Sequence, residues 1–418
     1  MKPQYILAIL LVIPALFFFS CDDDTGTTGP STQPPDQPSN PYPADGATNV
    51  GAESITLSWT CSNTVSAELT YTLVWYIYHI YQSRDTVTGL TTTEYTLQDL
   101  YPGTEYGWRV TATDEYGETN YGPTWEFTTE DEIVTFNDYI LELLIRGSIS
   151  MPTGDLYASN VSNIYYFDAN NCGIEDITGL EYLIGTQQLL LSSNSISILS
   201  TLSELVWLER LTLTANQISS ISPLSGLNHL EHLEISGNQI SDLSPLSGMV
   251  YLEYLQLGYN QISDLSPLAE INHLEYLYLN HNNISDLTPL SDLVLLQYLT
   301  LDSNQVVDIS PLSNLILADH VSLMSNQIID ITPLSGLLLM YELDLADNQI
   351  SDISALSALA LIHNVGLSDN AITNIEPLVN NIGLGSGDHV YLYNNPLDSM
   401  SVNVYIPELE ARGVSVFY

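Results

Sequence analysis

The chain has 418 residues, 45% of them hydrophobic, and its 50 acidic residues face six basic ones, which gives a formal net charge of −44. This negative field repels nucleic-acid phosphates and anionic lipid headgroups, so the composition argues against nucleic-acid binding and electrostatic membrane attachment. The length exceeds that of one ordinary hydrophobic core and predicts two or three domains.

The first residues are typical of an export signal. Lys2 supplies a positive charge, an apolar run too short for a comfortable membrane span follows, and Ser20 precedes Cys21. The end of this run resembles a bacterial lipobox, which implies cleavage before Cys21 and lipid on that cysteine. An ordinary signal peptide is the alternative. We therefore expect residues 1–20 to be a signal peptide and the protein to be exported and lipid-anchored to the bacterial cell envelope, at the outer membrane or cell surface.

Residues 21–40 form a predicted tether after the lipidated cysteine. Thr, Gly, Pro, Ser and Gln dominate this stretch, a composition that cannot bury a core. Beyond it the chain contains only Cys61 and Cys172, which fall in different predicted domains. A disulfide framework is therefore not expected, despite the exported setting.

Residues 41–130 contain short β-rich runs separated by turn residues, which predicts an antiparallel sandwich. The segment resembles a fibronectin type III domain. Trp59 stands at the position of that domain's core tryptophan, and "LYPGTEYGWRV" places Tyr106 in a tyrosine corner. The expected role of this domain is that of a spacer, because a fold by itself carries no function.

A 22-residue repeat runs without gaps from Val161 to Asn380, in ten full units. An eleventh, partial unit follows and is displaced three residues by "GLGSGD". Each unit follows L-x-x-L-x-L-x-x-N-x-I, the leucine-rich repeat pattern. The leucine-flanked stretch alternates between inward and outward positions, which predicts one short parallel strand per unit, with turns or 3-10 segments on the opposite, convex side.

Two polar positions recur in the repeat. The asparagine is expected to satisfy backbone groups of the turn after the strand, and Cys172 takes its place in the first unit as a structural thiol. Ser244 is expected to cap the convex turn before Pro245. A convex aspartate is expected to cap turn N–H groups, with bound calcium as the alternative; it recurs at Asp242, Asp264, Asp286, Asp308, Asp330 and Asp352.

Both ends of a solenoid need covers, because its core and strand edges would otherwise be exposed. Residues 131–160 are the predicted N-terminal cap, with an amphipathic helix that Asn137 caps and Gly147 ends. Residues 396–418 are the predicted C-terminal cap, in which Gly413 ends a helical turn before a last edge strand. These caps and the repeat unit resemble internalin-like bacterial leucine-rich repeat proteins, which implies a right-handed solenoid over residues 161–395 with its parallel sheet on the concave face.

The residues that flank the inward leucines of each strand are expected on the concave face, which solenoids usually offer to partners. Repeats five to seven carry a tyrosine cluster there, with a histidine on either side along the solenoid axis. Such tyrosines suit protein or sugar contacts, although stacked aromatics also stabilise a parallel ladder by themselves. The predicted ligand-binding residues are Tyr254, Tyr276, Tyr278, Tyr298, His232, His320 and the adjacent Tyr259.

Catalytic motifs are missing from the sequence. No histidine falls in an H-E-x-x-H or paired-cysteine spacing, and no hydrolase or nucleotide-binding motif occurs in its required context. We therefore expect no enzymatic activity, no cofactor and no metal site. The favoured function is that of a monomeric surface receptor for a protein or glycan. The alternative is a structural acidic envelope or matrix protein whose assembly depends on cations.

Overall fold

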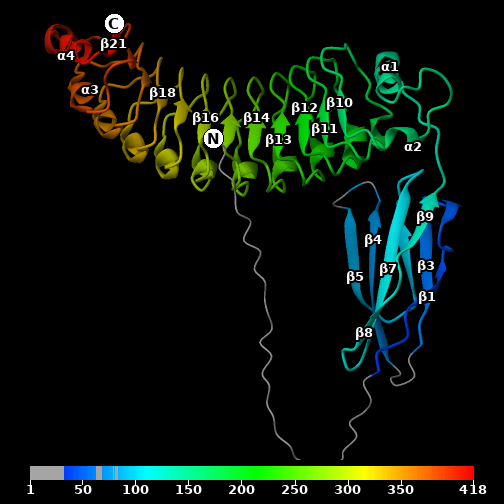
Figure 1. Cartoon of the computed structure of the whole chain (residues 1–418). Helices are drawn as coiled ribbons and strands as arrows, with labels where there is room; N and C mark the ends of the chain where they lie inside the picture. The colour runs from blue at the N-terminus through cyan, green and yellow to red at the C-terminus, as the bar shows by residue number, and fades with distance from the viewer. Residues whose placement is uncertain (1–32, 63–67, 79, 81–82) are drawn as a thin grey trace, which may run out of the picture.

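The computed structural model describes residues 33–62, 68–78, 80 and 83–418. These residues form a β-sandwich followed by a long solenoid (Figure 1). The predicted signal peptide, the predicted lipidation site Cys21 and the first part of the predicted tether lie outside the described residues. Within the described part of the chain, no helix has the length and apolar character that a membrane span requires.

The sandwich consists of a three-stranded and a six-stranded sheet. The smaller sheet has the order β1-β3-β6, with β1 (Ser39–Tyr42), β3 (Ser54–Thr60) and β6 (Glu94–Gln98). The larger has the order β2-β9-β7-β4-β5, with β8 beside β7: β2 (Ala47–Val50), β9 (Trp125–Thr129), β7 (Glu105–Asp114), β4 (Leu69–Ile77), β5 (Arg84–Leu90) and β8 (Thr119–Tyr121).

Two signature residues of the sandwich occupy their predicted places. Trp59 is 3% exposed and packs edge-on against Tyr71 in the core. The hydroxyl of Tyr106 accepts the backbone N–H of Tyr101 at 3.0 Å, which is the hydrogen bond of a tyrosine corner. Burial raises the pKa of Tyr106, so this hydroxyl stays protonated.

The N-terminal cap of the solenoid contains α1 (Tyr139–Ser148) and α2 (Ala158–Val161). The predicted limits of the first helix were wrong at both ends. Asp138 is the N-cap in place of Asn137, because its carboxylate accepts the N–H groups of Ile140 and Leu141 at 2.8 and 3.1 Å. The helix also continues past Gly147, and Ser150 takes the left-handed conformation after its end, with φ at 57°.

The solenoid places its strands side by side in one parallel sheet of twelve, ordered as in the sequence. Each three-residue strand lies one 22-residue step from the next up to β19. The strands are β10 (Tyr166–Asp168), β11 (Gln188–Leu190), β12 (Arg210–Thr212), β13 (His232–Glu234), β14 (Tyr254–Gln256), β15 (Tyr276–Tyr278), β16 (Tyr298–Thr300), β17 (His320–Ser322), β18 (Glu342–Asp344), β19 (Asn364–Gly366), β20 (His389–Tyr391) and β21 (Ser415–Phe417).

Short 3-10 segments line the opposite side of the repeats, as the sequence predicted. They are η1 (Leu180–Tyr182), η2 (Ser200–Glu204), η3 (Ser222–Leu224), η4 (Ser244–Leu246), η5 (Ser266–Leu268), η6 (Thr288–Leu290), η7 (Ser310–Asn314), η8 (Thr332–Gly336) and η9 (Ser354–Ala358). The helix α3 (Glu376–Asn380) replaces the segment in the next unit. Between these segments and the sheet lies a single continuous core of leucine and isoleucine side chains.

The C-terminal end follows the predicted plan. The glycine-rich insertion lengthens one step, so that Asn364 pairs with His389. After the π-helical η10 (Ser401–Tyr405) and α4 (Ile406–Ala411), Gly413 adopts φ of 93° and the chain turns into β21. This last strand pairs only with β20 and ends the sheet.

The repeated asparagine has its predicted structural role. The Asn260 side-chain amide donates to the carbonyls of Ile235 and Leu257, both at 3.1 Å, and its oxygen accepts the Ile240 N–H at 3.0 Å. In the first unit the Cys172 thiol donates to the Asn170 carbonyl at 3.2 Å. Both described cysteines, at positions 61 and 172, are free thiols.

The convex aspartates cap the 3-10 segments, as predicted. Asp242 Oδ1 accepts the N–H of Ser244 at 2.8 Å. The other five aspartates of the column make the same contact two residues on, at 2.8 or 2.9 Å. Contrary to the prediction, Ser244 itself is not the cap, because it is the first residue of the segment and Leu243 occupies the N-cap position. The carboxylate two residues earlier reaches the free N–H group first.

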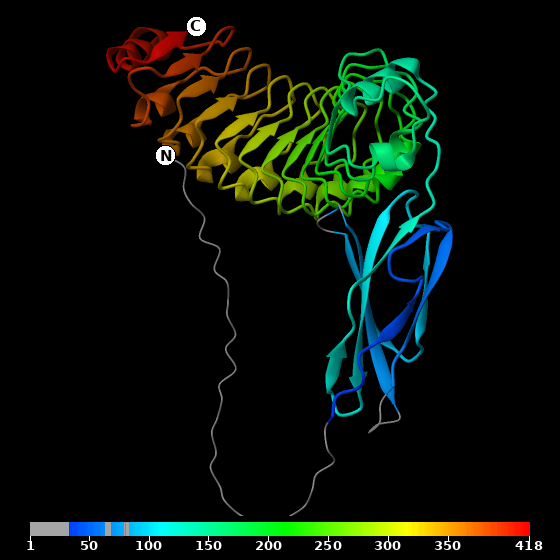
Figure 2. The ribbon, with the colours of Figure 1, turned by 45° about the vertical axis from the view of Figure 1, so that its right-hand side comes forward.

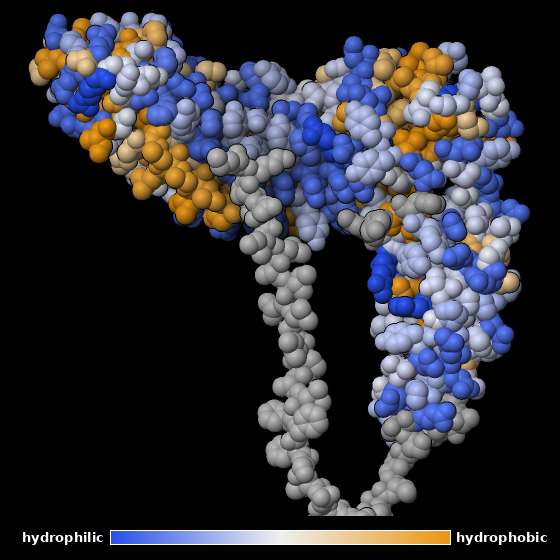
Figure 3. All heavy atoms as spheres, in the orientation of Figure 1, coloured by the Kyte–Doolittle hydropathy of each residue, from blue (hydrophilic) through white to orange (hydrophobic). Residues whose placement is uncertain are grey.

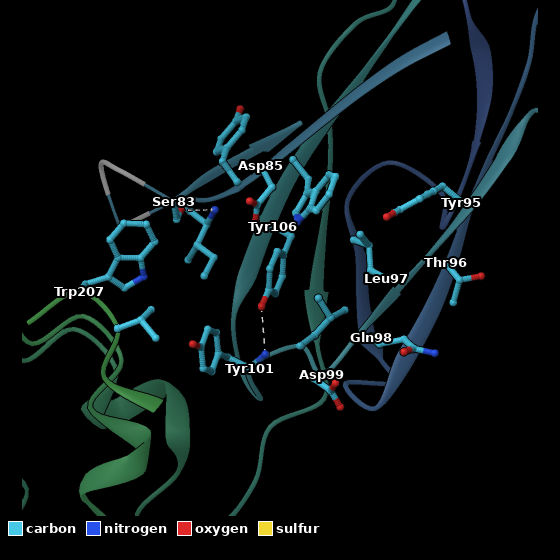
Figure 4. A pocket seen from close by; sticks show the side chains of 15 residues that line it. Ser83, Asp85, Tyr95, Thr96, Leu97, Gln98, Asp99, Tyr101, Tyr106 and Trp207 are labelled. Atoms are coloured by element: carbon cyan, nitrogen blue, oxygen red, sulfur yellow. Dashed lines mark hydrogen bonds between the residues drawn. The ribbon is translucent and has the colours of Figure 1, made fainter. Parts of the chain in front are cut away.

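The sandwich packs directly against the first repeats of the solenoid (Figure 2). Ile184 is 4% exposed and belongs to the hydrophobic core of the sandwich, against which Trp207 also packs. The Tyr101 hydroxyl donates to the Glu204 carbonyl at 3.3 Å. Tyr101 and Trp207 line an interdomain pocket of about 410 Å³ (Figure 4). The fibronectin-like domain therefore has a defined contact with the solenoid, which the expectation of a spacer did not include.

Candidate ligand-binding surface

The first and third side chains of each solenoid strand lie on the side of the sheet that faces away from the leucine core. We call this side the sheet face; it is the surface predicted from the sequence as the concave face. In β14 and β15 the central residues Leu255 and Leu277 are fully buried, whereas Tyr254, Tyr276 and Tyr278 are partly exposed. Parallel pairing sets Tyr254 beside Tyr276, and Tyr276 beside Tyr298. The alternation of a strand therefore brings the predicted tyrosines onto one surface.

Five aromatic side chains make a continuous series of ring contacts across this surface. His232 stacks on Tyr254 at 4.0 Å between ring centroids, Tyr254 meets Tyr278 at 5.3 Å, and Tyr278 meets Tyr298 at 4.9 Å. Tyr298 stacks on His320 at 5.3 Å. We call these five residues the aromatic row; Tyr276 lies beside it, 5.8 Å from Tyr254.

The row passes diagonally between strands because Tyr278 occupies the third position of its strand, whereas Tyr254 and Tyr298 occupy the first. Diagonal neighbours on a sheet lie within reach of aromatic side chains. Tyr278 therefore bridges two tyrosines that are two strands apart.

The phenol groups of the row are hydrogen-bond donors at neutral pH. Burial raises the pKa of Tyr278 to about 12. Burial likewise raises the pKa of Tyr254 and of Tyr298 above the ordinary value. The partly exposed rings therefore offer apolar faces and protonated hydroxyl groups together, a combination that suits protein and sugar surfaces alike.

A charged cluster forms the margin of the row at His232. Glu234 Oε1 accepts hydrogen bonds from Arg210 at 2.7 Å and from His232 at 2.6 Å. The His232 hydrogen bond, followed by the charges of His232 and Arg210, lowers the pKa of Glu234 against the opposing effect of burial. The carboxylate therefore holds the imidazole in place against Tyr254. Arg210 and Glu234 both flank the inward leucines of their strands, but the repeat pattern does not predict that they join His232 in one cluster.

The margin at His320 is acidic. His320 Nδ1 lies 2.6 Å from Asp319 Oδ1, and its Nε2 lies 3.8 Å from Glu342 Oε2. Nearby, Asp302 accepts hydrogen bonds from the Ser322 hydroxyl and the Met324 N–H, and burial raises the pKa of Asp302. The two ends of the row thus differ in charge, because Arg210 offsets Glu234 at one end only.

Tyr259 lies apart from the row. It occupies the turn after β14, has φ of 56°, is 58% exposed and stacks on His281 with ring centroids 4.1 Å apart. Its position is the left-handed one that recurs after each strand, so its side chain leaves the chain in another direction from those of the strand. Tyr259, one of the predicted ligand-binding residues, therefore pairs with His281 apart from the aromatic row.

Among the described residues, no group of three or more His, Cys, Asp and Glu side chains is arranged to hold a metal ion. The convex aspartates each use an oxygen to cap a turn. Contacts of this kind offset the cost of a column of like charges without a bound cation.

Comparison with known proteins agrees with this architecture. A model of the fibronectin type III domain matches residues 41–128, and a model of leucine-rich repeats in two copies matches residues 228–270 and 272–314. An internalin from Listeria monocytogenes, InlF, is similar in structure with a TM-score of 0.57 and 27% identity, over 68% of this chain and 96% of that one. Internalin C2 of the same species is 33% identical over 56% of this chain and 94% of that one, with a TM-score of 0.46. No curated protein matches the chain in sequence.

A sheet with one strand per 22-residue unit, an asparagine ladder and 3-10 turns on the other side define a leucine-rich repeat protein, a class whose solenoids act as binding surfaces. The chain is an internalin-like leucine-rich repeat protein that carries a fibronectin type III domain before its solenoid.

Proposed function

We propose that this protein is a non-catalytic recognition protein of the bacterial cell surface, which binds a protein or glycan through the sheet face of its solenoid. The proposal includes export and lipid anchoring at Cys21, which follow from the sequence of the first 21 residues. Under this proposal the tether and the fibronectin type III domain hold the solenoid away from the membrane.

The observation that carries the proposal is the aromatic row. Its rings join strands β13 to β17 without a break, and each keeps part of its surface in contact with solvent. Rigid aromatic side chains give a large contact area at a small entropic cost, which is why they dominate binding hot spots. The row would therefore supply stacking and hydrogen bonding, with no bond-making step.

Stabilisation of the sheet is the competing role for the same side chains. Two features favour binding. Polar and small side chains, such as Gln256 and Thr300, occupy the third-position sites next to Tyr278. His232 is oriented by a partly buried carboxylate, Glu234, an arrangement that pre-organises a ring for a partner.

The test compares the chain from residue 22 onward with its Tyr254→Ala, Tyr278→Ala and Tyr298→Ala triple variant. Both are applied to a glycan array and to immobilised surface preparations of bacterial and host cells, some treated with protease and others with periodate. We expect the native chain to bind and the variant to lose at least tenfold in affinity, a loss of about 1.4 kcal/mol. Sensitivity to protease or to periodate then separates a protein ligand from a glycan.

A second triple variant is the matched control. Tyr42, Tyr116 and Tyr139 are exposed tyrosines far from the sheet face, with 60%, 51% and 73% of their surface accessible. Their replacement by alanine should leave binding unchanged. Circular dichroism first establishes that all three chains are equally folded. Equal binding by the native chain and the sheet-face variant would refute the proposed site.

A further inference from the structure

A second surface lies on the side of the solenoid where the chain passes from each 3-10 segment to the next strand. We call this side the lower flank. From the second unit to the partial eleventh one, two neighbouring positions face away from the solenoid core there, directly after the buried residue that begins the unit. One column contains Ile184, Val206, Asn228, Val250, Asn272, Val294, Ile316, Leu338, Ala360 and Ile382, and the other contains Gly185, Trp207, His229, Tyr251, His273, Leu295, Leu317, Leu339, Leu361 and Gly383.

The N-terminal end of the lower flank is an established interface within the molecule. Ile184 and Trp207 pack into the hydrophobic core of the fibronectin type III domain, and Val206 lines the pocket between the domains. Apolar residues in these two columns therefore bind a folded domain where they are covered.

The C-terminal end of the same columns is apolar and uncovered. Eight side chains there have between 37% and 90% of their surface exposed, and none carries a charge. Figure 3 shows the corresponding hydrophobic patch along the lower side of the C-terminal repeats. We call this surface the apolar strip; it comprises Val294, Leu295, Ile316, Leu317, Leu338, Leu339, Leu361 and Ile382.

Two repeats with polar side chains lie between the two apolar stretches, Asn228 with His229 and Asn272 with His273, and the exposed Val250 and Tyr251 stand between these two repeats. The two imidazoles are bonded to backbone carbonyls of the preceding repeat at 3.1 and 2.8 Å. One polar repeat, that of Asn272 and His273, therefore separates the strip from Val250 and Tyr251. At its exposures the strip offers on the order of 800 Å², about the area that one partner contributes to a standard interface and more than the largest patch of a typical monomer.

The chemistry of the apolar strip limits the kinds of partner that can bind it. An uncharged aliphatic surface on a chain of net charge −44 gives a cationic partner nothing to pair with inside the contact. A flat membrane is disfavoured as well. The fibronectin type III domain projects from the same flank, and the chain enters that domain at the end away from the solenoid (Figures 1 and 2). The domain would hold the strip off any bilayer that carried the anchor.

We propose that the apolar strip binds the same strip of a second copy of this chain, in a two-fold symmetric dimer. The two strips are identical and apolar, as an isologous interface requires. This dimer replaces the monomer expected from the sequence, and it leaves the sheet face of each copy open for the ligand.

Antiparallel packing of the strips brings Leu338 close to the symmetry axis, because its repeat is the third of the five that form the strip. Six repeat steps separate Leu339 from Trp207, whereas only three strands follow β18. The fibronectin type III domain of each copy therefore falls beyond the last strand of the other. Repulsion between two acidic chains opposes association, so salt should strengthen the dimer by screening it.

Sedimentation velocity of residues 22–418, which contain both described domains, tests the proposal. We expect the mass to double as the concentration rises, and the change to occur at lower concentration in higher salt. The pair Leu338→Asn and Leu339→Asn should weaken association at least tenfold. The matched pair Val250→Asn and Tyr251→Asn alters exposed residues of the same columns outside the strip and should leave association unchanged.

Cysteine crosslinking tests the symmetry. Leu338→Cys should oxidise to a disulfide-linked dimer, whereas Val294→Cys, at one end of the strip, and Asn228→Cys, outside it, should not. Cys61 and Cys172 are present in every variant and cancel in the comparison. Crosslinking through Val294→Cys without Leu338→Cys would contradict the two-fold arrangement.

Three results would overturn the proposal. The native chain could remain monomeric up to about 100 µM, a concentration at which even weak specific complexes form. Association could persist unchanged in the Leu338 and Leu339 pair variant. Finally, a monomeric native chain could float with phosphatidylcholine vesicles while the pair variant does not, which would assign the strip to a membrane.

Discussion

The imidazole of His232 lies flat on the phenol ring of Tyr254, with ring centroids 4.0 Å apart and 5° between the planes. The same imidazole is hydrogen-bonded to Glu234, which also holds Arg210. A single histidine therefore joins the aromatic row to the charged cluster at its margin. Changes in the charge of Glu234 should reach the tyrosines through this ring.

Glu234 predicts a specific loss of stability in acid. The hydrogen bond from His232 lowers its pKa below the ordinary 4.5. A carboxyl group whose pKa is lower in the folded state stabilises the fold above its unfolded pKa, and this contribution disappears as the pH falls through the folded pKa. We expect Glu234→Gln to lose less stability than the native chain between pH 6 and pH 3.5, by about 1 kcal/mol or less for a partly exposed pair.

Urea denaturation at the two pH values measures this difference. Glu231→Gln, at an exposed acidic position of the same repeat, is the control and should follow the native chain. Parallel acid losses in the native chain and in Glu234→Gln would contradict the prediction.

The asparagine ladder predicts a larger effect. Asn260→Ala removes the partners of the Ile235 and Leu257 carbonyls and of the Ile240 N–H. Because these groups are buried, we expect the free energy of unfolding to fall by about 2 kcal/mol or more. Hydrogen exchange should also accelerate at the Ile240 amide. Asn272→Ala alters an exposed asparagine one repeat further on and should change neither quantity.

Substitution of a convex aspartate can distinguish turn capping from calcium binding. Asp264 accepts the Ser266 N–H at 2.8 Å, a role that asparagine can also fill. Asp264→Ala should therefore lower the unfolding temperature, while Asp264→Asn should retain most of it. Calcium or a chelator should leave the unfolding temperature of all three chains unchanged. A rise with calcium that Asp264→Asn abolishes would instead support a cation site.

We expect the contact made by Trp207 to hold the fibronectin type III domain and the solenoid in a fixed arrangement. Its side chain packs against the core of the fibronectin type III domain, although it belongs to the solenoid. Trp207→Ala should loosen the domain contact without unfolding either part, which small-angle scattering would detect as a broader distribution of interatomic distances. Tyr251→Ala alters an exposed aromatic residue two repeats further along the lower flank and should leave the scattering unchanged. Identical curves for Trp207→Ala and the native chain would show that other contacts hold the domain.

Much of the solenoid could be predicted because its energetics depend on neighbouring repeats. A fixed period determines which residues become partners, so the pairing of Tyr254 with Tyr276 and the role of Asn260 follow from counting. Local competition is harder to predict. Asn137 and Asp138 both suit a helix N-cap, and only the path of the backbone selects Asp138. The same competition between adjacent polar groups favoured Asp242 over Ser244.

Contacts that depend on side-chain direction or on a second domain were beyond the sequence. Counting placed Tyr278 near Tyr254 and Tyr298, but the diagonal series of rings depends on how each ring tilts. Trp207 occupies a variable position of its repeat, and nothing in the repeat pattern indicates that the fibronectin type III domain covers it. The ring contacts of the aromatic row and the contact between the domains therefore could not be predicted from the sequence.

The asparagine ladder also bears on how such a chain can change its length. Each asparagine accepts an N–H group from the unit before it, as Asn260 does from Ile240, and Asn395 does so for Ile372 after the last full unit. A gene duplication that adds one whole unit thus supplies both a new donor and a new acceptor, and every seam stays matched. Unequal crossing-over between nearly identical segments such as "NQISDLSPL" could lengthen or shorten the molecule in single steps while its terminal caps remain untouched.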